Sequence, residues 1–181
     1  MSLVLLIDWS IPNGLAEIYA ESNSCVFVGK KDKVIDRTEA LVILQSCAAT
    51  KEYDGFERLG IMKIFHENVL VGFSMPRKIE AKEELKFKLK EDDTYHRIGP
   101  VYITKAHRGK GVMSETIREF QNIVGKMIWT CNELNDVSAK AALSGGLKYS
   151  HHIYVTENRQ YLFNPFPNQV RVDLVYKSEV K

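Results

Sequence analysis

Ile103-Thr104-Lys105-Ala106-His107-Arg108-Gly109-Lys110-Gly111 joins an apolar run to a segment with helical periodicity. A strand that leads through a glycine-rich basic turn into a helix leaves backbone N–H groups unpaired at the helix start, where the helix dipole adds partial positive charge. Glycine at 109 and 111 would let the backbone approach an anion without a clash of Cβ. This stretch therefore predicts a phosphate-binding turn.

Helices and strands are expected to alternate after this turn. Met113, Ile117, Phe120 and Val124 recur at helical spacing, which predicts a helix. The segments expected next are a buried strand at Lys126–Cys131, a short helix at Val137–Leu143, a hairpin of Tyr149–Thr156 with Gln160–Phe163, and a closing strand at Gln169–Tyr176.

The first half of the chain predicts one helix and mainly antiparallel strands. Residues 38–49 follow an acidic first turn and have an apolar face, as a helix does. The expected β-segments are a hairpin of Leu59–Phe65 with Val69–Met75, an alternating strand at Leu85–Lys90 and a strand at Arg97–Thr104. The apolar run near the N-terminus is a first strand or a helix start. Together these elements predict a mixed α+β fold in one domain spanning residues 1–181.

Composition excludes few classes of protein. A net charge of +2, from 25 basic and 23 acidic residues, gives no overall cationic field for nucleic acid. Two basic clusters, Lys30–Lys33 and Lys86/Lys88/Lys90, are interpreted as solvated surface, with an acidic partner such as nucleic acid as the alternative. Three widely spaced cysteines indicate reduced thiols and a cytoplasmic protein, and the N-terminal apolar run is too short to span a membrane.

The order of these motifs resembles that of the GNAT superfamily of acyl-CoA-dependent N-acetyltransferases. The family pattern Gln/Arg-x-x-Gly-x-Gly/Ala matches Arg108 to Met113, its Asn-x-x-Ala/Ser matches Asn135 to Ser138, and its closing Gly-Phe matches Gly146-Leu147. The match covers roughly residues 98–150. The resemblance implies a central, mostly antiparallel mixed sheet flanked by helices, in which the fourth and fifth strands are parallel and splay apart.

The resemblance also implies acetyl-CoA as the acyl donor. Amides of Arg108, Gly109, Lys110, Gly111, Val112 and Met113 would hold the diphosphate, with Arg108 and Lys110 as added cations. Backbone groups near Ile103 would pair with the pantetheine arm, and Asn135 and Ser138 would contact it from the fifth strand's end. The amine would then attack the thioester directly, without a covalent enzyme intermediate.

Two positions depart from the family pattern. Met113 replaces a small residue, so its side chain must point away from the phosphates. Ala142 stands where the family frequently has a tyrosine that protonates the leaving thiolate. Ser138, Ser144, Tyr149 or water would have to supply that proton, and the sequence does not choose among them.

The sequence also does not decide which residue is the general base, and the candidates are Tyr102, His96 and Glu57. Tyr102 lies on the expected fourth strand, and His96 has an ordinary pKa near neutrality. For His96 and Glu57 the alternative is an exposed side chain without a catalytic role. No metal site is expected, because His151 and His152 are adjacent on a strand and would point to opposite faces. The aromatic residues Tyr161, Phe163, Phe166 and Tyr176 are expected in the core, with a substrate wall as the alternative.

The sequence thus predicts an N-acetyltransferase that moves an acetyl group from acetyl-CoA to a primary amine. The alternative, favoured by Ala142, is a module of the same fold that binds coenzyme A or another phosphate ligand without turnover. The acceptor is left open among a small polyamine or antibiotic-like amine, a protein terminus and an amine on a modified nucleic acid. The oligomeric state is also open, with a homodimer as one alternative.

Overall fold

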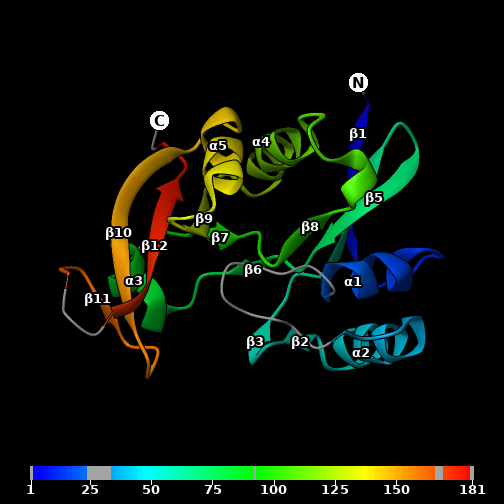
Figure 1. The fold of residues 1–181 in the computed structure, drawn as a ribbon, viewed down its shortest axis with the longest axis horizontal. Helices are drawn as coiled ribbons and strands as arrows, with labels where there is room; N and C mark the ends of the chain where they lie inside the picture. Colours follow the sequence, from blue (N-terminus) through cyan, green and yellow to red (C-terminus); the bar gives the residue numbers. More distant parts are fainter. Residues whose placement is uncertain (1, 24–33, 92, 166–168, 180–181) are drawn as a thin grey trace.

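Two larger β-sheets and the helices that cover them form most of the computed structural model, which describes residues 2–23, 34–91, 93–165 and 169–179. The first sheet has the strand order β1-β4-β5-β8, and the second has the order β11-β10-β12-β9-β7-β6. The helices lie on both sides of these sheets, and the expected α+β architecture is confirmed (Figure 1). No helix in the described residues is long and apolar enough to cross a membrane.

The first sheet is antiparallel throughout. Its strands are β1 (Leu3–Asp8), β4 (Ile61–His66), β5 (Val69–Ser74) and β8 (Val101–Ile103). Glu67 and Asn68 join β4 to β5 with positive φ values of 52° and 65°, the backbone that a two-residue hairpin requires. The predicted hairpin is therefore confirmed, and the N-terminal apolar run is a strand.

The second sheet contains one parallel pair. Its strands are β6 (Arg77–Lys78), β7 (His96–Arg97), β9 (Met127–Asn132), β10 (Lys148–Thr156), β11 (Tyr161–Leu162) and β12 (Gln169–Lys177). β7 runs parallel to β9, and the other pairs are antiparallel. A separate small hairpin joins β2 (Glu52–Tyr53) to β3 (Phe56–Glu57).

The expected strand at Arg97–Thr104 is divided between the two sheets. Its first part, β7, pairs with β9, and its last part, β8, pairs with β5. Residues 98–100 connect the two parts. We call this connection the fork, because β8 and β9 are not hydrogen-bonded to each other beyond it. The fork separates the two sheets where the resemblance implies splayed strands.

Side chains alternate between two cores along β8. Ile103 belongs to the core beneath α4 (Val112–Val124) and α5 (Asp136–Ser144). Tyr102 points to the opposite face and packs in the core beneath α1 (Leu15–Asn23) and α2 (Arg37–Thr50). Figure 1 shows the two helix pairs on opposite sides of the sheet.

Two predicted features of the first half differ from the structure. Leu85–Lys90 is not a strand: α3 spans Glu84–Phe87, after a 3₁₀ turn at Ala81–Glu83 whose start is capped by Glu80 and Glu83. The alternation is misleading because Phe87 is fully buried while Leu85 is 79% exposed. Helix α1 was not predicted, although its buried residues Leu15, Ile18 and Tyr19 have helical spacing.

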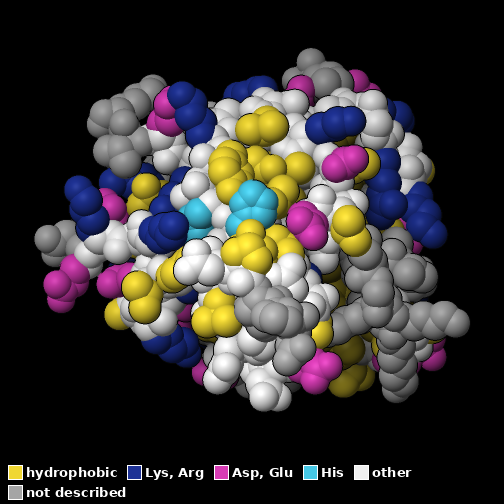
Figure 2. All heavy atoms as spheres, turned by 60° about the vertical axis from the view of Figure 1, so that its left-hand side comes forward, with side chains coloured by type: hydrophobic (Ala, Val, Ile, Leu, Met, Phe, Trp, Pro, Cys, Tyr) yellow, Lys and Arg dark blue, Asp and Glu magenta, His cyan; other side chains and the backbone are white. Residues whose placement is uncertain are grey.

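The predicted aromatic core near the C-terminus is only partly correct. Tyr176 is buried, as expected, but Tyr161 and Phe163 are 39% and 37% exposed. Phe166 lies outside the described residues. Figure 2 brings forward the side of the molecule that carries β10 and β11, where hydrophobic side chains gather around histidines.

Candidate functional site

The turn between β8 and α4 has a left-handed backbone at both glycines. Gly109 and Gly111 have φ values of 74° and 76°, a region that residues with a Cβ rarely adopt. A 3₁₀ turn at Lys105–His107 precedes them, and Gly111 caps the start of α4. A Cβ at either glycine would meet nothing within 4 Å, so the space in front of this turn is open.

Consecutive backbone amides in this turn have no acceptor in the part of the chain that the structure describes. The last turn-forming bonds run from His107 N to Thr104 O and from Arg108 N to Lys105 O, and the first helical bond runs from Glu115 N to Gly111 O. Within the described residues, no hydrogen bond is donated by the amides of residues 109–113. We call these amides the nest. Such a group of N–H donors at a helix start is suited to binding an anion.

Side chains around the nest divide between the core and solvent. Val112 is buried, and Met113 packs against the core beneath α4, so Met113 points away from the open side of the turn. Lys105 and Lys110 are exposed. The Arg108 side chain instead turns back along β8, where Nε donates to the carbonyl of Ile103 at 3.1 Å and the guanidinium lies 5.1 Å from the centre of the Tyr102 ring.

The edge of β8 that faces away from β5 carries backbone groups that no strand pairs with, although the Ile103 carbonyl accepts from Arg108 Nε. Thr104 N donates to Val71 O and Met75 N donates to Pro100 O, so residues 100, 102 and 104 are the hydrogen-bonded positions of this antiparallel pair. The N–H and C=O groups of Val101 and Ile103 therefore point towards the gap beyond the fork. Gly72 permits the close pairing on the other side, since a Cβ there would lie 2.3 Å from the Tyr102 carbonyl oxygen.

Helix α1 contributes a carboxylate to this region. Glu21 Oε1 accepts hydrogen bonds from the Tyr102 hydroxyl and from the Lys105 amide, both at 2.9 Å. The hydrogen bonds from the Lys105 amide and the Tyr102 hydroxyl lower the Glu21 pKa, and they outweigh burial, which alone would raise it. Sequence reasoning missed Glu21 because it missed α1.

A small cavity of about 130 Å³ lies on the α1 side of β8. Tyr19 and Tyr53 contribute hydroxyl groups that lie 3.1 Å apart and are hydrogen-bonded. The full lining is Tyr19, Ser22, Asn23, Tyr53, Phe73, Pro100, Val101 and Tyr102. This cavity therefore adjoins the fork and the strand that carries the open edge.

The second motif, at Asn135, has a clear structural use. Asn135 Oδ1 caps α5 by accepting from the Ser138 amide at 3.1 Å, and the Ser138 hydroxyl accepts from Trp129 Nε1 at 3.1 Å. The Ala142 side chain is fully buried in the core beneath α5. The position at which the family often carries tyrosine thus faces the protein interior.

The remaining candidates for catalysis are not brought together with Tyr102. His96 N donates to the carbonyl of Lys126, just beyond the end of α4, whereas the nest lies at the start of this 13-residue helix. A helix of that length is about 20 Å long. Burial lowers the His96 pKa, and His96 Nδ1 is buried with no hydrogen-bond partner in the described residues.

Tyr149, Glu57 and the histidine pair also lie apart from the nest. Tyr149 is 48% exposed on β10 and packs edge-on against Tyr176 and His152. Glu57 is an exposed residue of β3. His151 bonds to the Lys86 carbonyl and His152 to the Tyr149 hydroxyl, so the two rings have separate partners.

Comparisons with known proteins find the fold but no close relative. No protein-family model matches the chain, and no curated protein matches it in sequence. A GNAT-family acetyltransferase from Bacillus anthracis has a TM-score of 0.63 and 14% identity, over 97% of this chain and 93% of that chain.

Two further similar structures contain acetyl-CoA or coenzyme A. RimL, a ribosomal L7/L12 α-N-protein acetyltransferase in complex with coenzyme A, has a TM-score of 0.66 and 14% identity over 97% of this chain and 92% of its own. The microcin C7 self-immunity acetyltransferase MccE, in complex with acetyl-CoA and AMP, has a TM-score of 0.64 and 13% identity over 98% and 92%. Similarity at this level of identity shows a shared fold.

Proposed function

We propose that this chain, which has the fold of the GNAT acetyltransferases, is an N-acetyltransferase that moves an acetyl group from acetyl-CoA to a primary amine. The observation that carries the proposal is the nest of unpaired amides beside the open edge of β8. The first amides of any helix lack intrahelical partners, so the proposal depends on their position beside the open edge of a strand. The complexes of RimL with coenzyme A and of MccE with acetyl-CoA support the same reading.

The residues present fit the donor. The amides of Gly109 to Met113 would hold its diphosphate, and the exposed Lys105 and Lys110 would add positive charge. The outward N–H groups of Ile103 and Val101 and the Val101 C=O would pair with the pantetheine arm, while the Ile103 C=O accepts from Arg108 Nε. Because Ile103 is nearer the nest than Val101, the arm would place its thioester end at the fork.

The chemistry at the fork is direct transfer. Acetyl-CoA supplies an activated thioester; the amine nitrogen forms the new C–N bond, and the C–S bond breaks to release coenzyme A as a thiolate. We assign to Tyr102, with Glu21 behind it, the removal of the proton that the amine loses. Because Ala142 is buried and has no proton to donate, we assign protonation of the thiolate to solvent.

The second candidate function is binding of coenzyme A without turnover. Two observations favour it: Ala142 is buried, and Arg108 turns back along β8 instead of extending from the turn. Both functions use the same nest, so binding alone does not separate them.

Two measurements test the proposal. Acetyl-CoA should raise the melting temperature, and thiol release should rise when primary amines are added with acetyl-CoA. A melting temperature raised by acetyl-CoA, with no amine-dependent thiol release across a broad amine panel, would favour the binding module. No change in melting temperature would refute both functions.

A further inference from the structure

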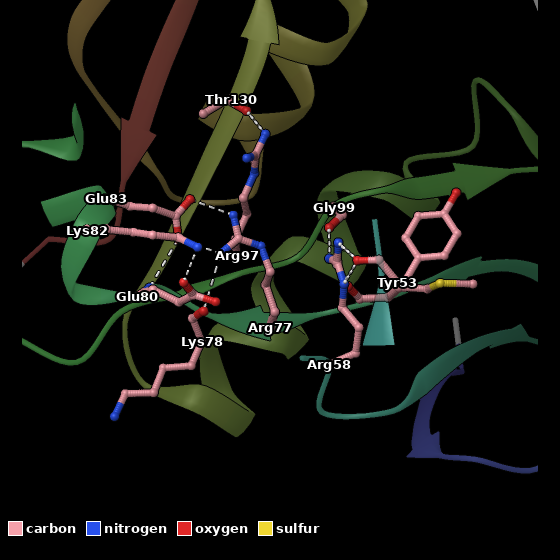
Figure 3. Close-up of polar contacts among 11 residues, drawn as sticks. Tyr53, Arg58, Arg77, Lys78, Glu80, Lys82, Glu83, Arg97, Gly99 and Thr130 are labelled. Atoms are coloured by element: carbon pink, nitrogen blue, oxygen red, sulfur yellow. Dashed lines mark hydrogen bonds and ion pairs between the residues drawn. The ribbon is translucent and has the colours of Figure 1, made fainter. Parts of the chain in front are cut away.

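Arg97 occupies the last position of β7, immediately before the fork. Its cross-strand neighbour on β6 is Arg77, so two like charges stand directly opposite each other. Such a pair destabilises a sheet unless other groups balance it. Figure 3 shows these arginines together with Arg58, which approaches the fork from the first half of the chain.

Arg77 and Arg58 have the partners that a structural arginine needs. Arg77 forms a bidentate pair with Glu83, with N–O distances of 2.6 and 2.7 Å, and both residues are buried. Arg58 donates to the carbonyl oxygens of Tyr53, Met75 and Gly99, which fixes it against the fork. These two side chains are therefore committed to the fold.

Arg97 has no carboxylate partner among the described residues. Its Nη2 donates to Thr130 Oγ1 on β9 at 2.5 Å, and its guanidinium lies 6.0 Å from the centre of the Phe87 ring. The carboxylate of Asp173, on the neighbouring β12, is paired with Arg171 at 3.0 Å. Burial and the adjacent Arg77 lower the Arg97 pKa, and the more distant carboxylates of Glu83 and Asp173 only partly oppose this effect. Holding a cation in this way costs stability unless an anion joins it.

Arg97 is half-buried and lies on the face of the sheet opposite α4. Ile98, the next residue, packs beneath α4, and strand side chains alternate, so Arg97 projects to the other face, where Phe87 lies. Direct transfer requires donor and acceptor to be bound at once. With the donor arm along the open edge of β8, we expect the acceptor to approach the fork from the face on which Arg97 lies.

We propose that the acceptor amine carries an oxyanion, a carboxylate or a phosphate, and that Arg97, held by Thr130, binds it at the fork. This inference rests on the proposed transferase function. The guanidinium retains N–H donors in the planar arrangement that matches both kinds of oxyanion. Binding the anion there would also relieve the repulsion between Arg97 and Arg77.

Matched acceptors test the proposal. Acetyl transfer is measured by thiol release for pairs of amines that differ only in the anion: an amino acid and its amide, and O-phosphoethanolamine and ethanolamine. We expect kcat/KM at least tenfold higher for the anionic member of one or both pairs. Arg97→Gln should remove this preference, Arg97→Lys should keep part of it, and Arg37→Gln, which removes an exposed arginine at the start of α2, should keep all of it.

A binding measurement separates this proposal from the function on which it rests. In the presence of coenzyme A, an N-acetylamino acid should bind at least tenfold more tightly than its amide, or N-acetyl-O-phosphoethanolamine more tightly than N-acetylethanolamine. If no amine is acetylated but this preference is found and requires Arg97, the transferase function fails and the anion site stands. Equal binding and equal kcat/KM within every pair, or a preference that survives in Arg97→Gln, would overturn the anion site.

Discussion

Gly111 shapes the nest by its backbone. Its left-handed conformation ends the turn and aims the first amides of α4 at the open side. We predict that Gly111→Glu weakens acetyl-CoA binding at least tenfold, because it places a carboxylate against the diphosphate. Isothermal titration would measure the affinity.

Gly55 provides a matched control for this substitution. It has a φ of 75° in the β2–β3 turn, and a Cβ there also meets open space. A left-handed residue with a Cβ costs about 1–2 kcal/mol, so Gly55→Glu and Gly111→Glu should lose similar stability. Only Gly111→Glu should lose acetyl-CoA. Equal affinity in the two variants would remove the nest from the site.

Glu83 is the carboxylate that balances the arginine pair. Burial alone would raise the Glu83 pKa, but the hydrogen bonds from Arg77 and from the Glu80 amide outweigh it, and the pKa is lowered. We predict that Glu83→Gln destabilises the protein by about 3–5 kcal/mol, because it leaves Arg77 buried and uncompensated beside Arg97. Urea unfolding would measure the loss, with Glu84→Gln at the neighbouring position, the first residue of α3, as the control.

The lowered Glu83 pKa also predicts a pH dependence. A carboxyl group whose pKa is lower in the folded state stabilises the protein above its unfolded pKa, here an ordinary value of 4.5. That stabilisation is lost as the pH falls from 4.5 through the folded value. The difference in unfolding free energy between wild type and Glu83→Gln should therefore shrink with acidification. A difference that stays constant to pH 3 would contradict this assignment.

At the scale of single elements, α5 depends on its first residues. Asn135 caps the helix through the Ser138 amide, and Ser138 also holds the indole of Trp129 on β9. We predict that Asn135→Ala costs about 1 kcal/mol of unfolding free energy, whereas Asn135→Ser, which can still cap, costs little.

The same two variants test whether Asn135 contacts the pantetheine arm, as the family resemblance implies. If Asn135 contacts the donor, Asn135→Ser should weaken acetyl-CoA binding while keeping its stability. Unchanged affinity in Asn135→Ser would restrict Asn135 to capping, and unchanged stability in Asn135→Ala would contradict the capping role.

Elements whose pattern is local were predictable from the sequence, and elements set by distant partners were not. The α4 helix and the β4–β5 hairpin follow from spacing and alternation within a few residues. The division of one expected strand into β7 and β8 depends on β9, thirty residues later, and no local pattern encodes it. Arg97 was not identified as a candidate site residue for the same reason, because its environment is created by Arg77 on the opposite strand and Thr130 on β9. The alternation at Leu85–Lys90 led to the wrong prediction of a strand, because only some of the apolar side chains in this segment are buried.

At the scale of the molecule, acetyl-CoA should connect the two sheets. We predict that it slows hydrogen exchange at the amides of residues 109–113 and at Val101 and Ile103. The Thr104 amide, which already donates to Val71, should change little and serves as an internal control. At a concentration one hundred times Kd, the donor should also add about 2.7 kcal/mol to the free energy of unfolding. Protection confined to other segments would contradict the proposed donor path.

The short connection at the fork sets which way β8 is turned. Strand side chains alternate strictly, so one residue added between Arg97 and Val101 would rotate β8 by half a turn about its axis. Tyr102 would then enter the core beneath α4, and Ile103 would face α1. The N–H and C=O groups that now point into the gap would point towards β5 instead. Chain length between these two positions is accordingly as strict a requirement on this protein as the identity of any side chain around them.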